Sequence, residues 1–126
     1  MSKQAKPELH RFPDVTDVPL VVYRGVLNGS AGECEALFEQ HGWGGGWRAG
    51  IFHYHHFHAE THEVLGMIRG EAEVRFGGSD GPVVSVRAGD VVIIPAGVAH
   101  CREKGEVMCV GAYPEGYQPD MNRGAP

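Results

Sequence analysis

Short apolar runs alternate with glycine-rich turns over most of the chain. After residue 47 the runs are rich in aromatic and β-branched residues, and Gly, Pro or Asp separates them. Glycine-rich turns that recur about every eight to twelve residues are typical of a β-sandwich or a small barrel. The pattern predicts strands over residues 19–23, 48–58, 63–68, 72–76, 83–87, 91–94, 98–102 and 107–113.

One segment has a helical pattern instead. Ser30 is followed three residues later by Glu33, which is the arrangement of an N-terminal capping box. Gly42 stands where many helices end with a left-handed residue. We therefore predict a helix over about residues 31–41. A flexible glycine loop is expected over residues 43–47, and its position after a helix argues against a phosphate-binding loop.

The length of the chain favours one domain. A chain of 126 residues can bury a single core but leaves no room for a second domain. We expect the domain to span residues 18–113. Residues 1–17 are expected to form an N-terminal arm, either disordered or lying across a sheet edge, and residues 114–126 to form a polar tail.

Charge and composition narrow the partners. The formal net charge of −5 argues against a nucleic acid or an anionic membrane surface as partner. No apolar run approaches the roughly 18 residues of a membrane span, and the first residues lack the apolar segment of a signal peptide. The three cysteines are an odd number and are widely spaced. We therefore expect a cytoplasmic protein without a disulfide framework.

Histidine is the residue type that points to chemistry. The chain has eight histidines, and five of them fall within residues 53–62. Alternate residues of a strand share a face, so His56 and His58 are expected to point the same way. Glu63 follows after a short turn, and His100 begins a later strand that a barrel can bring opposite. Imidazole and carboxylate donors that converge in this way suit a divalent metal ion.

Neighbouring residues offer alternatives to these donors. His53 and His55 should point away from the shared face and are interpreted as non-ligands. Backbone parity places only one of His62 and Glu63 inward, so His62 competes with Glu63 for the same position.

Three further residues are candidates for the wall of a substrate pocket. Phe52 and Tyr54 share the face of the histidines, and the Tyr54 hydroxyl could donate a hydrogen bond to substrate. Met67 lies on the Glu63 side of its strand. Core packing is the alternative role for all three, and no residue is placed well enough to be named as a catalytic acid or base.

Two spaced motifs resemble those of the cupin superfamily. The first comprises Gly50, His56, His58, Glu63 and Gly70, and the second comprises Gly89, Pro95, Gly97 and His100. Lys104 stands where the second motif usually has Asn, a departure that we interpret as local variation in the loop. The segment from His55 to Gly66 and the late Gly-Ala-Tyr-Pro-Glu-Gly also resemble a subgroup of small single-domain bacterial cupins (RmlC-like barrels).

The resemblance implies an all-β jelly-roll barrel, here with one short N-terminal helix. It also implies one divalent transition metal per chain, bound by His56, His58, Glu63 and His100. Iron, manganese, nickel, cobalt and zinc all accept such donors, so the ligand set does not distinguish among them. Small cupins commonly pair, and the outward Phe57 together with the edge strands favours a homodimer.

Three functions are compatible with such a site. The first is a metalloenzyme acting on a small molecule, either dioxygenase-like or isomerase- or decarboxylase-like, because four protein ligands leave about two open positions on a six-coordinate ion. The second is a non-catalytic module that binds or senses a small ligand. The third is a purely structural metal. The fold alone does not choose among them, since cupins have many unrelated functions, but the pattern favours an enzyme.

Overall fold

The computed structural model describes residues 6–115 and 122–124. The remaining parts of the predicted arm and tail, residues 1–5, 116–121 and 125–126, lie outside the described residues. The elements in chain order are β1 (Glu8–His10), β2 (Leu20–Tyr23), α1 (Ala31–Gln40), β3 (Trp43–Ala49), β4 (His56–Phe57), β5 (Glu63–Phe76), β6 (Val83–Arg87), β7 (Val91–Ile94), β8 (His100–Pro114) and β9 (Asn122–Arg123).

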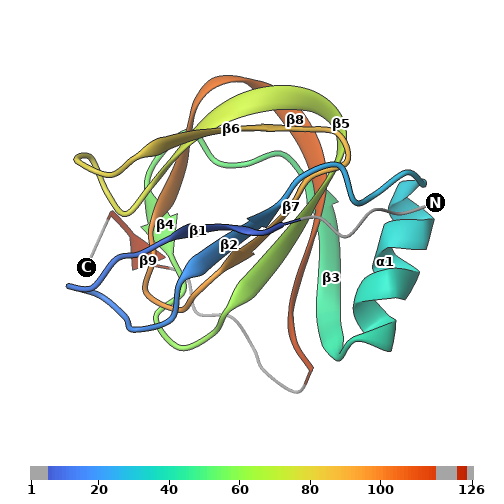
Figure 1. Cartoon of the computed structure of the whole chain (residues 1–126), viewed down its shortest axis with the longest axis horizontal. Coiled ribbons are helices and arrows are strands. Elements are labelled where there is room, and N and C mark those ends of the chain that lie inside the picture. Colours follow the sequence, from blue (N-terminus) through green and yellow to red (C-terminus); the bar gives the residue numbers. More distant parts are fainter. Residues whose placement is uncertain (1–5, 116–121, 125–126) are drawn as a thin grey trace.

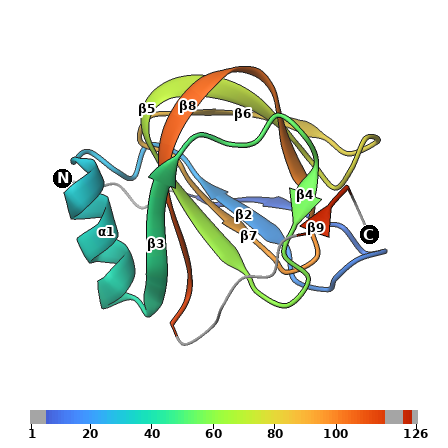
Figure 2. The same cartoon turned by 180° about the vertical axis from the view of Figure 1, so that it is seen from behind.

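The strands form one antiparallel sheet that curls into a barrel, with α1 packed outside it (Figure 1). The strand order is β1-β2-β7-β5-β8-β4-β9, while β3 also pairs with β8 and β6 also pairs with β5. Seen from behind, β3 and β4 form the opposite wall from β2 and β7 (Figure 2). The predicted all-β architecture with one short helix is therefore confirmed.

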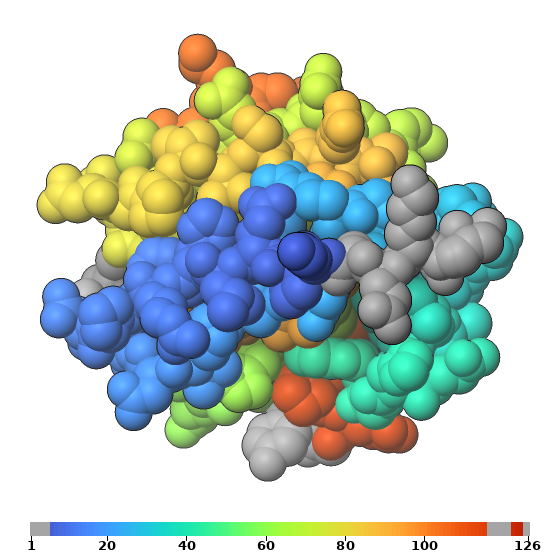
Figure 3. Space-filling view, viewed as in Figure 1, coloured from blue at the N-terminus to red at the C-terminus, as the bar shows by residue number. Residues whose placement is uncertain are grey.

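Strand β1 lies within the segment predicted as an N-terminal arm. Its residues pair with β2, from Glu8 opposite Val22 to His10 opposite Leu20. Of the two arrangements considered for the arm, these residues adopt the one along a sheet edge. The N-terminal strands cover the front of the barrel in the space-filling view (Figure 3).

Two long strands replace two pairs of predicted short strands. The tight turn predicted at residues 69–71 is wrong, because β5 continues through it, and β8 likewise joins the strands predicted over 98–102 and 107–113. The two strands pair along most of their length, with register shifts near Gly70 and Gly105. Both glycines have positive φ, +86° and +75°. A glycine with positive φ occurs in β-bulges as well as in turns. The spacing of glycines alone therefore does not locate the ends of strands.

The predicted glycine loop over residues 43–47 is also wrong, since these residues belong to β3. The strand pairs with β8 through a register shift between Gly44 and Trp47. Opposite Trp47 stands Gly111, where an added Cβ would lie only 2.1 Å from the indole ring. The Trp47 ring therefore packs directly against the backbone at Gly111, where a larger residue would clash with it.

The strand predicted over residues 48–58 is interrupted. Residues 50–55 are irregular between β3 and β4, and β4 has only two residues. Alternation along a strand therefore does not determine where side chains of residues 50–55 point.

The predicted helix is confirmed as α1. Ser30 is its N-cap, and the Ser30 hydroxyl oxygen accepts a hydrogen bond from the backbone amide of Glu33 at 3.3 Å. Cys34 and Phe38 are buried against the sheet, where Gly66 leaves room for both: a Cβ at Gly66 would lie 2.5 Å from the Cys34 sulfur. Among the described residues, no helix is long and apolar enough to cross a membrane.

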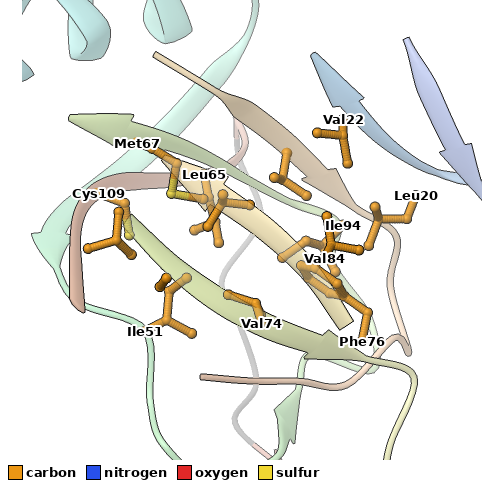
Figure 4. Packing of buried hydrophobic residues seen from close by; sticks show 14 of the residues in the cluster. Leu20, Val22, Ile51, Leu65, Met67, Val74, Phe76, Val84, Ile94 and Cys109 are labelled. Atoms are coloured by element: carbon orange, nitrogen blue, oxygen red, sulfur yellow. The ribbon is translucent and has the colours of Figure 1, made fainter. Parts of the chain in front are cut away.

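Apolar side chains of the sheet fill the barrel interior. They come from strands far apart in the sequence and point toward one another (Figure 4). Each large aliphatic side chain removed from water stabilises the fold by about 1.5–3 kcal/mol. The cluster includes Leu20, Val22, Leu65, Met67, Val74, Phe76, Val84, Ile94 and Cys109.

One buried carboxylate fastens the end of β2 to the turn between β6 and β7. Asp90 is 2% exposed, and its Oδ2 atom accepts hydrogen bonds from Arg24 Nη1 at 2.9 Å and from the Arg87 amide at 3.0 Å. The Oδ1 atom accepts from the Gly25 amide at 3.0 Å. Arg24 also forms an exposed ion pair with Glu8 at 2.7 Å.

Replacing Asp90 with Ala should lower the free energy of unfolding by about 2 kcal/mol, because two backbone amides lose their acceptor. The matched control is Glu8→Ala, which removes the exposed partner of the same arginine and should cost less than about 1 kcal/mol. Urea unfolding followed by circular dichroism measures both. Equal losses in the two variants would contradict this account of the turn.

Candidate metal centre

Four polar side chains are buried together inside the barrel. His56, His58, Glu63 and His100 are each at most 5% exposed. His56 lies on β4, directly opposite His100 at the start of β8, and Glu63 begins β5. Residues 56–63 and the distant start of β8 thus bring the four side chains together.

The distances define a common centre. Glu63 Oε1 lies 3.3 Å from His100 Nε2 and 3.5 Å from His58 Nε2. The rings of His56 and His100 have centroids 4.0 Å apart. One donor atom from each of His56, His58 and Glu63 lies within 4.8 Å of the other two. The four side chains therefore face one small volume.

Two atoms of this centre lack partners within the described part of the chain. Glu63 Oε1 and His56 Nδ1 are buried and accept or donate no hydrogen bond there. An unsatisfied buried polar group costs about 1–3 kcal/mol, and more when it is charged. A bound cation would remove that cost at Glu63, and mixed imidazole and carboxylate donors fit a divalent transition metal.

The ionisation of the donors also fits a metal. Burial raises the pKa of Glu63, but the neighbouring His100 and His58 outweigh it and lower that pKa to about 2. Burial and then the nearby His100 lower the pKa of His56 to about 4. At neutral pH Glu63 is therefore ionised and His56 neutral, the states in which both bind metal ions.

The orientation of His100 is supported by its other ring nitrogen. His100 Nδ1 lies 3.4 Å from the carbonyl oxygen of Val98. A hydrogen bond from Nδ1 to this carbonyl holds the ring with Nε2 toward Glu63, so Nε2 is the nitrogen that a metal ion would use.

The structure separates His62 from Glu63. His62 is exposed, and its Nδ1 atom accepts a hydrogen bond from the Ala96 amide at 2.8 Å. Glu63 is the residue of the two that points inward.

A second group of possible metal donors comprises His55, Cys101 and Glu103, whose donor atoms lie within 4.8 Å of one another. Cys101 follows His100 on β8, so strand alternation directs it to the opposite face of the sheet. Glu103 already faces Arg75, with 3.4 Å between Oε2 and Nε. His53 is exposed and belongs to neither group.

A cavity of about 290 Å³ opens onto the four buried donors. Phe52 lies in its wall, whereas Tyr54 and Met67 are absent from the described lining. Tyr54 stacks on Phe52 with ring centroids 4.9 Å apart, and the Arg123 guanidinium lies 4.0 Å from its ring centre. Met67 is 1% exposed in the barrel core (Figure 4). The prediction for Tyr54 relied on strand alternation, which residues 50–55 do not have.

Two pocket residues were missed by the sequence reasoning. Trp47 and Tyr113 both line the cavity, and Trp47 Nε1 donates a hydrogen bond to the Tyr113 hydroxyl at 2.9 Å. The Tyr113 ring lies edge-on to His58, with centroids 5.4 Å apart. Trp47 had been assigned to a loop, and no local signal connects it with a residue at the end of β8.

Comparison with known proteins identifies the fold. Oxalate decarboxylase of Bacillus subtilis, studied for its Mn(II) centres, superimposes with a TM-score of 0.52 at 17% identity over 83% of this chain. The match spans only 27% of that enzyme. Acireductone dioxygenase of Bacillus anthracis, with a cadmium ion in its active centre, gives a TM-score of 0.50 at 19% identity, covering 71% of this chain and 68% of that one. Identities this low establish the fold alone.

Sequence comparison supplies the family. No family model matches the chain. YjlB of Bacillus subtilis, an uncharacterized protein, is 43% identical over 122 residues, which cover 95% of this chain and 73% of YjlB. The chain belongs to the YjlB family. The barrel and its structural neighbours show the cupin fold that the two motifs indicated.

Proposed function

We propose that this cupin holds one divalent transition metal per chain through His56, His58, Glu63 and His100 and acts on a small molecule. The observation that carries the proposal is the buried, ionised Glu63, whose Oε1 atom has no hydrogen-bond partner among the described residues yet lies within 3.5 Å of two imidazole nitrogens. A carboxylate in that position is stabilised when a cation lies between it and the histidines.

A metal held by four protein donors supplies about two open positions for a chelating substrate, dioxygen or water. The chain itself supplies the enclosure. Phe52, Leu65 and Trp47 line the cavity beside the donors and keep water away from a bound molecule. Among the described lining residues, Tyr113 carries the one hydroxyl group, which can hydrogen-bond to such a molecule.

A metalloenzyme is the function that this site supports best, with a dioxygenase-like or an isomerase- or decarboxylase-like reaction. The two enzymes among the structural neighbours support the choice of class. The alternative is a non-catalytic module that binds or senses a small ligand. It is favoured by the scarcity of acid or base groups in the described lining, where the four donors and Tyr113 are the titratable residues.

The protein purified without a metal-binding tag should contain about one metal ion per chain, and His58→Ala should lose it because one of four ligands is gone. The matched control is His53→Ala, which removes an exposed histidine of the same segment and should retain the metal. Elemental analysis by mass spectrometry measures both, and the metal found directs the assay: iron with an open site points to oxygen chemistry.

Absence of metal from the wild-type protein, even after incubation with iron, manganese and zinc, would contradict the metal site. Equal metal content in His58→Ala and His53→Ala would contradict the assignment of the ligands.

We also propose a cytoplasmic homodimer with small-molecule ligands and no nucleic-acid or membrane partner. All three cysteines are free and buried, in keeping with a reducing compartment.

Three apolar side chains near the edge strand β1 are each at least 40% exposed: Leu9, Val15 and Val18. Apolar groups and an unpaired strand edge together favour contact with a second copy. We also propose that residues 18–113 form a single domain.

Sedimentation at micromolar concentration should give the mass of a dimer. Changing Leu9 and Val18 together to Ser should shift the distribution toward monomer, because apolar contact area is lost. Val83→Ser, an exposed valine on β6, serves as the control. A monomeric wild-type protein would rule the dimer out.

A further inference from the structure

The cavity beside the proposed metal centre has a composition that restricts its ligand. Apart from the four donors, its lining is Trp47, Ala49, Gly50, Ile51, Phe52, Leu65 and Tyr113. Among the described residues of this lining there is no lysine or arginine, and Glu63 is the one carboxylate. Proteins usually recognise small dicarboxylates with a guanidinium or ammonium group, and the cavity offers neither.

An arginine that contacts the backbone of the cavity wall is engaged elsewhere. Arg102 donates from Nε to the Ile51 carbonyl oxygen at 3.2 Å and from Nη1 to the Gly105 carbonyl oxygen at 2.9 Å. Ile51 turns its side chain to the barrel interior, where it is 6% exposed, so the guanidinium lies behind the wall rather than in the cavity.

Charge balance also disfavours a dianion as the ligand group that would bind the metal. A divalent ion with one carboxylate and three neutral imidazoles carries a net charge of about +1. A monoanionic bidentate ligand neutralises it, whereas a dianion would leave an uncompensated negative charge among apolar side chains, which is costly.

The apolar walls suit a hydrocarbon or aromatic body. The Trp47 N–H is occupied by Tyr113, so the indole presents carbon to the cavity. The Tyr113 hydroxyl accepts that hydrogen bond and also interacts with Glu63, so it lies where the apolar wall meets the donors. A volume of about 290 Å³ lies at the lower end of small-molecule pockets but exceeds what a two-carbon diacid fills.

We propose that the cavity binds small molecules that combine a monoanionic, bidentate oxygen head with an apolar body, and that it disfavours small dicarboxylates such as oxalate. This inference rests on the metal site of the proposed function. The apolar body lies against Trp47, Ile51, Phe52 and Leu65, and the oxygen head faces the donors and Tyr113.

The test compares three chelators on zinc-loaded protein. Zinc is redox-inactive and avoids turnover. Trp43→Phe leaves Trp47, in the cavity wall, as the one tryptophan of the chain, and its fluorescence reports binding. Hexanohydroxamic acid should bind at least about tenfold more tightly than acetohydroxamic acid, because four more methylene groups leave water. Oxalate should bind more weakly than both, and calorimetry on the wild-type protein should give the same order.

A cavity-filling variant supplies the second readout. Ala49→Phe places a ring in the wall while leaving all four donors in place. Zinc content should be unchanged, and the affinity for hexanohydroxamic acid should fall by about tenfold or more, since the added ring occupies the space of the alkyl chain. Val83→Phe, on the exposed face of β6, is the matched control and should change neither quantity.

The outcomes separate the two proposals. If zinc is bound and oxalate binds more tightly than hexanohydroxamic acid, the ligand class is wrong and the metal site stands. Equal affinities for the two hydroxamic acids would refute the apolar body. If elemental analysis finds no zinc in the wild-type protein, the metal site fails and the ligand class fails with it.

Discussion

The burial of the Glu63 carboxylate is the constraint on which the centre of this protein depends. An ionised carboxyl group inside a barrel is costly unless opposite charge or hydrogen bonds compensate it. Here Glu63 is 2% exposed, and His58 and His100 face its Oε1 atom. Their attraction outweighs burial and keeps the carboxyl ionised, but leaves Oε1 without a hydrogen bond among the described residues. A cation at the centre completes this arrangement.

The curl of the sheet brings those groups together. Strands β5 and β8 run side by side across the molecule, with register shifts between Met67 and Arg69 and between Glu73 and Val74 of β5. The short strand β4 then adds His56 directly opposite His100. Because the apolar core is made by the same long strands, the residues that stabilise the barrel also fix the positions of the donors and of the cavity beside them. The pairing of β5 with β8 thus contributes to both the core packing and the geometry of the site.

Much of this arrangement could be predicted from the chain alone, for identifiable reasons. The helix was readable because Ser30 and Glu33 mark its start locally, and β6 and β7 because each is a short apolar run between turn residues. The four buried donors followed from motif spacing. Strand boundaries at Gly70 and Gly105 did not follow, since glycine marks bulges and turns alike. Tyr54 was misplaced because an irregular segment has no alternation, and the Trp47–Tyr113 pair depends on contact between residues 66 positions apart.

The most direct test of the central claim is a crystal structure of the zinc-loaded protein with anomalous diffraction recorded on both sides of the zinc absorption edge. The account predicts one strong anomalous peak, about 2.0–2.3 Å from a nitrogen of each of His56, His58 and His100 and from an oxygen of Glu63. A peak at His55, Cys101 and Glu103 instead, or none beside Glu63, would contradict it.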